Sequence, residues 1–135
     1  MTLKIPAVGE IELLRNMLGG TPAPSLTLKL YVNDYTPKDI DTADVYTEMS
    51  THGYTSRVLP SSGWTFTQLQ VVAEASSPTL TWQFLAAPAQ PIFGYYVVGT
   101  VDGILRWAER FDPTFSAELA GDALSIAPKI TFSSY

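Results

Sequence analysis

Residues 93–111 read FGYYVVGTVDGILRWAERF, and this stretch decides the predicted fold. Segments rich in β-branched and aromatic residues, which favour strands, stand on both sides of Asp102-Gly103. An Asp-Gly pair between apolar strands is typical of a type I′ hairpin turn, which needs positive φ at both central positions. The stretch therefore predicts a β-hairpin, whose five aromatic and two arginine side chains must be divided between two faces.

The length of the turn determines which side chains share a face of this hairpin. With Asp102 and Gly103 as the two turn residues, Val98 lies opposite Trp107. One face, which we assign to the core with Glu109 as its only charge, then carries Tyr96, Val98, Leu105, Trp107 and Phe111. The other face carries Phe93, Tyr95, Val97, Ile104, Arg106, Ala108 and Arg110. A four-residue loop gives the same facing pairs, whereas a three-residue loop would require a bulge and would break this assignment.

The second face is too apolar for a solvated surface and too charged for a core. Two interpretations stay open. The long arginine side chains can cover the aromatic residues themselves. Alternatively, the face meets another subunit or a partner, since aromatic residues and arginine are enriched in interface cores. On the second interpretation, Tyr95, Arg106 and Arg110 are the interface candidates of the hairpin.

Residues 9–18 show the spacing of an amphipathic helix, with Ile11, Leu14 and Leu18 on its apolar stripe. Gly19-Gly20 follows as a plausible stop. A helix of about ten residues is marginal alone in water. It must therefore dock, either on its own domain or on a neighbouring molecule. The three stripe residues are accordingly further interface candidates.

After the proline-rich linker 21–25 the period of the pattern changes to two. In residues 26–33 leucine and valine alternate with polar residues, as in a half-buried strand. Residues 34–53 form a long polar connection, of a kind that is often functional. Further strands are predicted at 45–49, 56–59, 65–72, 79–84, 123–127 and 129–133, with Pro128 as an interruption.

This order of elements predicts a mainly β protein, an antiparallel jelly-roll-like β-sandwich with a short N-terminal helix. An immunoglobulin-like sandwich is the alternative. We divide the chain into an N-terminal helical arm with its linker, residues 1–25, and a single β-sandwich domain, residues 26–135.

Composition excludes several classes of function. The chain has no cysteine, so disulfides and thiolate chemistry are impossible. Eight basic residues stand against thirteen acidic ones, a net charge of −5, which gives no electrostatic footprint for nucleic acid. No window approaches the ~20 apolar residues of a membrane span, and the N-terminus does not resemble a signal peptide. We therefore expect a soluble protein that binds neither nucleic acid nor membranes.

No pattern of residues indicates catalysis or a cofactor. The single histidine, His52, cannot form a His-rich metal site, and no G-x-S-x-G turn accompanies it. Asp39, Asp41 and Asp44 have a D-x-D-x-x-D spacing but lack the glycine and glutamate of an EF-hand loop, so we interpret them as a solvated acidic loop. We predict no enzyme, no metal and no cofactor.

The segments KIPAVGEIELLRNMLGG (4–20), LTLKLYVNDYTP (26–37), GYYVVGTVDGILRWAERF (94–111) and LSIAPKITFSSY (124–135) together resemble small virion proteins of tailed bacteriophages. These are encoded among the head genes and include the capsid decoration or cement proteins. The resemblance covers most of the chain. It is strongest in the hairpin, with its W-A-E-[RK]-F ending, and weakest over residues 34–91.

The resemblance implies a non-enzymatic capsid accessory, in many cases a jelly roll that trimerises on the outside of the capsid. We therefore expect a homotrimer that binds the major capsid protein, on the exterior of a virion assembled in the host cytoplasm. Another head, tail or connector protein of the same build is an alternative. A carbohydrate-binding module that uses Trp64 or exposed tyrosines is a further one, although aromatic residues on strands, such as Trp82, more often belong to the core.

Overall fold

The computed structural model describes residues 3–18, 25–60, 62–69, 72–86, 90–117 and 119–133. The protein is mainly β, with antiparallel sheets and one α-helix among the described residues. In chain order its elements are β1 (Leu3–Lys4), α1 (Ala7–Met17), β2 (Leu26–Tyr31), the 3₁₀ turn η1 (Ala43–Val45), β3 (Arg57–Val58), β4 (Thr65–Leu69), β5 (Val72–Ser76), β6 (Leu80–Gln83), β7 (Ile92–Gly99), β8 (Leu105–Phe115), β9 (Ala123–Ile126) and β10 (Lys129–Ser133).

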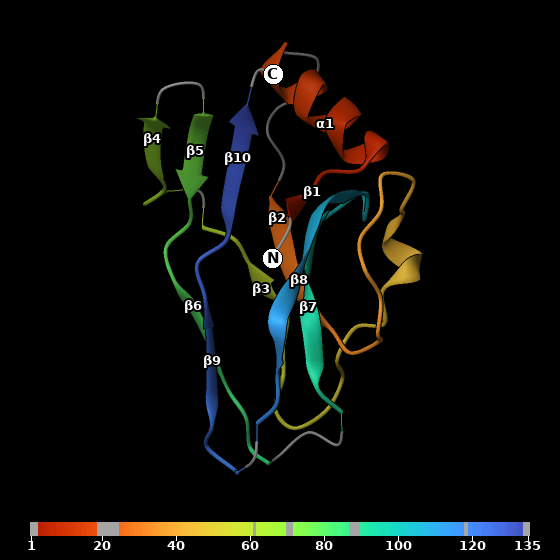
Figure 1. The fold of residues 1–135 in the computed structure, drawn as a ribbon, viewed down its shortest axis with the longest axis vertical. Helices are drawn as coiled ribbons and strands as arrows, with labels where there is room; N and C mark the ends of the chain where they lie inside the picture. The colour runs from red at the N-terminus through yellow and green to blue at the C-terminus, as the bar shows by residue number, and fades with distance from the viewer. Residues whose placement is uncertain are drawn as a thin grey trace.

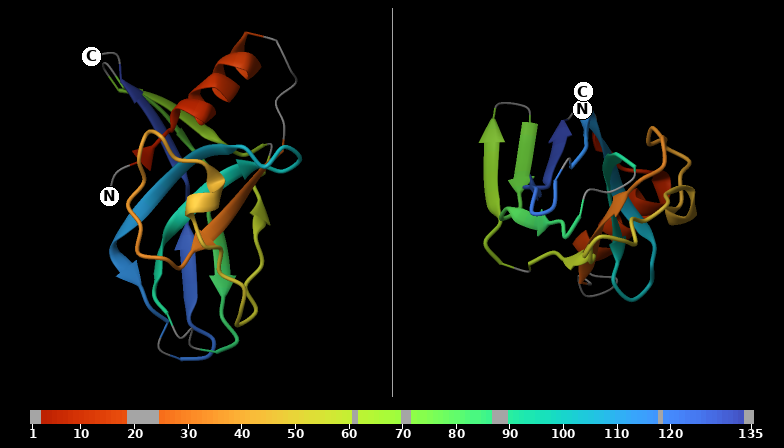
Figure 2. Two further views of the ribbon diagram at one scale, coloured as in Figure 1. Left: turned by 90° about the vertical axis from the view of Figure 1, so that its right-hand side faces the viewer. Right: turned by 90° about the horizontal axis from the view of Figure 1, so that it is seen from below.

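The strands form two layers, which Figure 2 shows end-on in its right-hand view. The first layer is a five-stranded sheet in the order β1-β8-β7-β2-β3. The second consists of the pair β6-β9 and the three-stranded sheet β10-β5-β4, which follow one another along the chain. β6 and β9 face the first sheet. β4, β5 and β10 extend past the end of the first sheet, at the same end of the molecule as α1 (Figure 1). We call this three-stranded sheet the flap.

The main core lies between the two layers. From the first layer it receives Leu28 and Leu30 of β2, together with Val97 and Trp107. From the second layer it receives Trp82, Phe84 and Ile126. The leucines of β2 share one face, as their alternation predicted, because successive side chains of a strand point to opposite sides.

A second apolar cluster covers the opposite face of the five-stranded sheet. It is built from Tyr31, Tyr46, Tyr96, Val98, Leu105 and Ala108. The connection between β2 and β3 brings Tyr46 onto this face, where its ring stacks on Tyr96 with the centroids 4.9 Å apart. Both faces of β7 are therefore buried, which explains why the hairpin contains so many aromatic residues.

The predicted pairing of the hairpin is wrong by two residues next to the turn and by one residue beyond the bulge. The backbone N–H of Gly99 donates to the carbonyl of Ile104, so the loop is longer than Asp102-Gly103 alone. A bulge then places Val98 opposite Leu105 but Val97 opposite Trp107, with Arg106 as the extra residue of β8. Trp107 lies in the main core as predicted. The β7 side chains around it in the core come from odd-numbered positions and not from the predicted even-numbered ones. A shift of one residue in the pairing exchanges the two faces of a strand.

Other boundaries also differ from the predictions. The stretch 65–72, predicted as one strand, contains β4 and the start of β5, which pair antiparallel with each other. In residues 45–49 the end of η1 and an isolated bridge between Glu48 and Tyr31 replace the predicted strand. The predicted helix starts two residues earlier, and β1 before it pairs with β8. The linker 21–25 lies outside the described residues except for Ser25.

The two-sided burial of β7 predicts a specific pattern of stability. Val97→Ala and Val98→Ala should each lower the free energy of unfolding by about 2 kcal/mol, because each removes buried methyl groups from a packed cluster. Val101→Ala, at a 93% exposed position of the same hairpin, should change it by less than about 0.5 kcal/mol. Urea unfolding of the three variants measures these values. A neutral effect at position 98 would contradict the second cluster.

Candidate assembly surface

The first turn of α1 is fixed to the rest of the protein. The N–H of Ala7 donates to the carbonyl of Asp39 (3.1 Å), and Lys4 forms an ion pair with the same aspartate (3.2 Å). Gly9 lies directly on β8: a Cβ there would lie 2.2 Å from the carbonyl oxygen of Arg106. Only glycine allows this approach without movement of one backbone. The N-terminal segment therefore docks on its own domain through β1 and this contact.

The stripe predicted for α1 nevertheless remains largely open to solvent. Ile11 and Leu14 are about half exposed, and Leu18 is 78% exposed. The left-hand view of Figure 2 shows α1 rising away from the five-stranded sheet beyond its first turn. These residues have the exposure that an interface requires, whereas a helix that merely capped its own core would bury its apolar stripe.

The flap exposes an apolar face of its own. Because Phe66 pairs with Ala75 and Phe132 pairs with Ala73, these residues lie on one side of the flap. Phe66 is 78% exposed and Phe132 is 56% exposed. The small alanines of β5 leave the two phenylalanine rings without cover from the strand between them.

The flap and α1 together enclose an open notch. It consists of two adjoining hollows of about 420 and 610 Å³, which share Leu13 and Phe132. Leu14 lines the larger hollow and Phe66 the smaller. The notch could not be predicted from the sequence. The alternation of residues around Phe66 and Phe132 indicates strands, but their proximity to Leu13 depends on how the flap is placed relative to α1.

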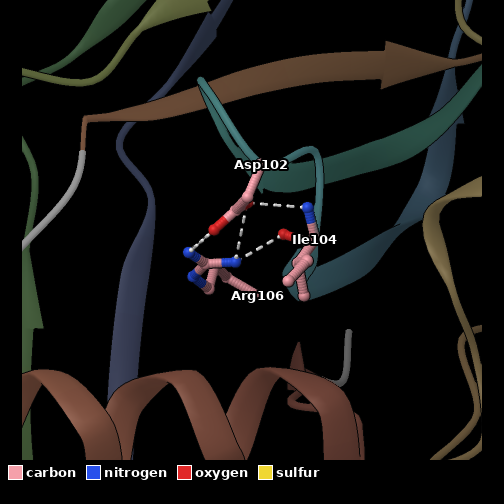
Figure 3. Close-up of polar contacts among 3 residues, drawn as sticks. All are labelled: Asp102, Ile104 and Arg106. Atoms are coloured by element: carbon pink, nitrogen blue, oxygen red, sulfur yellow. Dashed lines mark hydrogen bonds and ion pairs between the residues drawn. The ribbon is translucent and has the colours of Figure 1, made fainter. Parts of the chain in front are cut away.

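Arg106, predicted to lie on an interface face, is instead buried inside the hairpin. Its side chain is 1% exposed and forms an ion pair with Asp102 (Nη2–Oδ2, 2.9 Å), while Nη1 donates to the carbonyl of Ile104 (2.7 Å) (Figure 3). The other oxygen of Asp102 accepts from the N–H of Ile104 (2.8 Å). A Cβ at Gly99 would lie 2.1 Å from this oxygen, so glycine makes room for the pair. Arg106 therefore closes the turn and presents no charge to a partner.

Tyr95 also lies inside the protein, contrary to its predicted place on an outer face. It is 1% exposed in the main core, and its hydroxyl donates to Glu109 (2.9 Å). Burial, together with the negative charge of Glu109, raises the pKa of Tyr95 well above its ordinary value. The shift in hairpin pairing explains the error, since it moves the odd positions of β7 to the core face.

Arg110 keeps a partly exposed position at the edge of the second cluster. It forms an ion pair with Asp34 (2.7 Å), and its guanidinium lies over the ring of Phe93 at 5.2 Å from the centroid. These contacts fasten the start of the β2–β3 connection to β8. Its role at an interface stays a prediction.

The acidic cluster of this connection has a structural role. Asp41, expected in a solvated loop, is 3% exposed and accepts hydrogen bonds from the hydroxyls of Tyr35 (2.5 Å) and Tyr46 (3.0 Å) and from the N–H of Lys38 (2.8 Å). Asp39 pairs with Lys4, and Asp44 accepts from Thr42. Among the described residues no group of three or more potential ligands is placed to hold a metal ion.

The remaining candidates for chemistry do not meet in a site. His52 has positive φ (63°), and its ring nitrogen contacts the hydroxyl of its neighbour Thr51 (2.5 Å). Trp64 is partly buried against the main core, and its indole N–H donates to the carbonyl of Pro60 (2.7 Å). Trp82 is a core residue. The two tryptophans therefore do not form an open platform for a sugar.

Searches of protein-family models, curated proteins and solved structures found no match to this chain. Within the described part of the chain, no helix has the length and apolarity needed to cross a membrane. The apolar notch and the α1 stripe remain the most distinctive surface of the described residues, and we call the two together the assembly surface.

Loss of the charge on Asp102 should destabilise the folded protein at the hairpin turn. We expect Asp102→Asn to lower the free energy of unfolding by about 1–3 kcal/mol at pH 7, because it leaves the buried Arg106 without a counter-charge, although Asp102 itself is partly solvated. Asp34→Asn is the matched control, since its ion pair with Arg110 is more exposed and should contribute less than about 1 kcal/mol. Equal effects of the two variants would contradict the special role of Arg106.

The same pair predicts a pH dependence. The hydrogen bond from Arg106 holds the pKa of Asp102 below its ordinary 3.8. A carboxyl group with a lowered pKa stabilises the folded state above its unfolded pKa, and this contribution is lost as the pH falls through the folded value. The stability difference between the wild type and Asp102→Asn should therefore be constant above about pH 5 and shrink below pH 4. Chemical unfolding at each pH measures this difference.

Proposed function

We propose that this protein is a non-enzymatic virion component that decorates and stabilises the capsid of a tailed bacteriophage. On this proposal it binds the major capsid protein as a homotrimer on the outside of the particle. The single observation that carries the assembly role is the assembly surface, an apolar region that one copy of the chain leaves open. The phage particle itself comes from the resemblance of the four sequence segments.

The exposure of this surface supports a binding role. Folded monomers rarely leave large contiguous apolar patches in water, and such patches mark interaction sites. Here Leu14 and Leu18 of α1 and Phe66 and Phe132 of the flap are all exposed or half-exposed. The first turn of α1 is held firmly on β8, so the exposed stripe is presented on a fixed support rather than on a loose arm.

The remaining features are compatible with a shell component. Association around a closed symmetry axis repeats one contact several times, so that modest individual contacts act together. The jelly-roll topology implied by the resemblance stays part of the proposal, supported by the two packed layers of antiparallel sheet. Trp64, which a carbohydrate-binding module would need at its surface, instead packs partly against the core.

Substitution of the α1 stripe provides the test. Leu14→Glu should weaken binding to capsids that lack the protein at least tenfold, because loss of one buried leucine contact is worth about 1.5–3 kcal/mol. The unfolding midpoint should change little, since this side chain is half exposed in the free protein. Binding is measured by co-sedimentation with the capsids, and stabilisation by their resistance to heat.

Leu85→Glu is the matched control. Leu85 is 75% exposed and comes two residues after β6, a strand of the second layer that runs away from the flap and α1 (Figure 1). This variant should bind as the wild type does. Equal binding by Leu14→Glu and the wild type would refute the role of the stripe, and a protein that never joins capsids would refute the proposed function. A ring of few copies rather than many tens per particle would favour a connector or tail component.

A further inference from the structure

The outer edge of the flap is an unprotected β-strand. β4 pairs with β5 on one side through five regular residue pairs. Its other side has no neighbouring strand among the described residues. Thr65, Phe66, Thr67 and Gln68 are all exposed. An edge of this kind presents a row of backbone N–H and C=O groups that can pair with another strand.

Natural proteins usually protect such edges with charged residues, prolines or bulges. β4 contains no charged residue, no proline and no bulge. The other edges differ. β1 and β3 are only two residues long and each contains a basic residue, and β10 begins with Lys129 directly after Pro128. Among the described residues β6 and β9 also have a neighbour on one side only, but they are four residues long, and the carbonyl of Thr81 in β6 already accepts from Arg57. β4 is the longest uncharged edge strand of the described residues, so its edge is the best candidate for strand addition.

The uncharged stretch around β4 allows a second copy of this chain to supply the added strand. The chain carries a net charge of −5, so two copies repel each other overall, and a contact between them is least opposed where it contains no acid. No charged residue occurs from Val58 to Ala73, a segment that includes all of β4. We infer that β4 pairs antiparallel with β4 of a second copy, around a twofold axis at Thr67.

This pairing places Thr67 opposite Thr67 of the other copy, and threonine pairs are favourable between neighbouring strands. Around a twofold axis at Thr67, each Phe66 lies opposite Gln68 of the other copy, on the apolar side of the flap. The two flaps become one six-stranded sheet, and their apolar faces, each with its exposed Phe132, form one continuous surface. The contact is short, since β4 has five residues, so the dimer is weak and depends on protein concentration.

The inference does not depend on the proposed function, because it concerns one free strand edge and not the capsid. A twofold contact through β4 is also distinct from a threefold contact. In a homotrimer, β4 pairing would link each subunit to a subunit of another trimer and raise the mass of the assembly.

Two threonines give a matched test. Thr67 of β4 and Thr131 of β10 both lie directly beside Glu74 of β5, so a lysine at either position gains the same favourable neighbour. Thr67→Lys places two positive charges opposite each other at the twofold axis, where like charges are destabilising. In sedimentation velocity, Thr67→Lys should lose the largest assembly that the wild type forms, and Thr131→Lys should sediment as the wild type does.

A cross-link provides the second measurement. The chain has no cysteine, so a single Thr67→Cys variant can form a disulfide only between copies. Residues opposite each other in an antiparallel pair lie within the Cα distance range of a disulfide. Mild oxidation should therefore give a covalent dimer with Thr67→Cys and far less with Thr131→Cys.

Association of Thr67→Lys at wild-type strength, or equal cross-linking at both positions, would overturn the inference. Capsid co-sedimentation of the same variants separates it from the proposed function. Protein that pairs through β4 but ignores capsids would refute only the function. Protein that binds capsids but shows no effect at position 67 would refute only the β4 pairing.

Discussion

The structure depends on the burial of both faces of the β7–β8 hairpin. One face packs in the main core around Trp107, and the other packs beneath the tyrosines of the β2–β3 connection. A single continuous register would not place apolar side chains correctly on both sides. The bulge at Arg106 solves this, because it shifts the faces of β8 by one residue between Leu105 and Trp107. Asp102 then neutralises the arginine that the bulge turns inward.

This arrangement determines which surfaces remain for binding. The β2–β3 connection covers the outer face of the five-stranded sheet through Tyr46 and is locked by Asp41, so that face is closed. The carbonyl of Arg106, at the bulge, is also the support on which Gly9 of α1 rests. The stripe of α1 and the flap extend beyond the closed region, and they carry the large apolar side chains from which we infer assembly. The residues that stabilise the fold and those from which we infer binding therefore lie at different ends of the molecule.

Much of the architecture could be predicted from local patterns. The alternation in β2, the hairpin around Asp102 and the interruption at Pro128 each depend on a few neighbouring residues. The bulge could not be predicted, because it depends on a pairing between Arg106 and Asp102 that stabilises one of several turn lengths. For the same reason Tyr95 and Arg106 were assigned to the wrong environment. The notch was missed because its walls, α1 and the flap, lie far apart in sequence and meet only in space.

We propose that neighbouring molecules in a particle cover the assembly surface of α1 and the flap. A cryo-electron microscopy reconstruction of capsids with this protein bound, at a resolution that traces α1, would test this proposal. Another copy or the capsid protein should pack on Leu14 and on the notch around Phe132. A bound protein that contacts the particle elsewhere, and leaves both α1 and the flap in solvent, would contradict it.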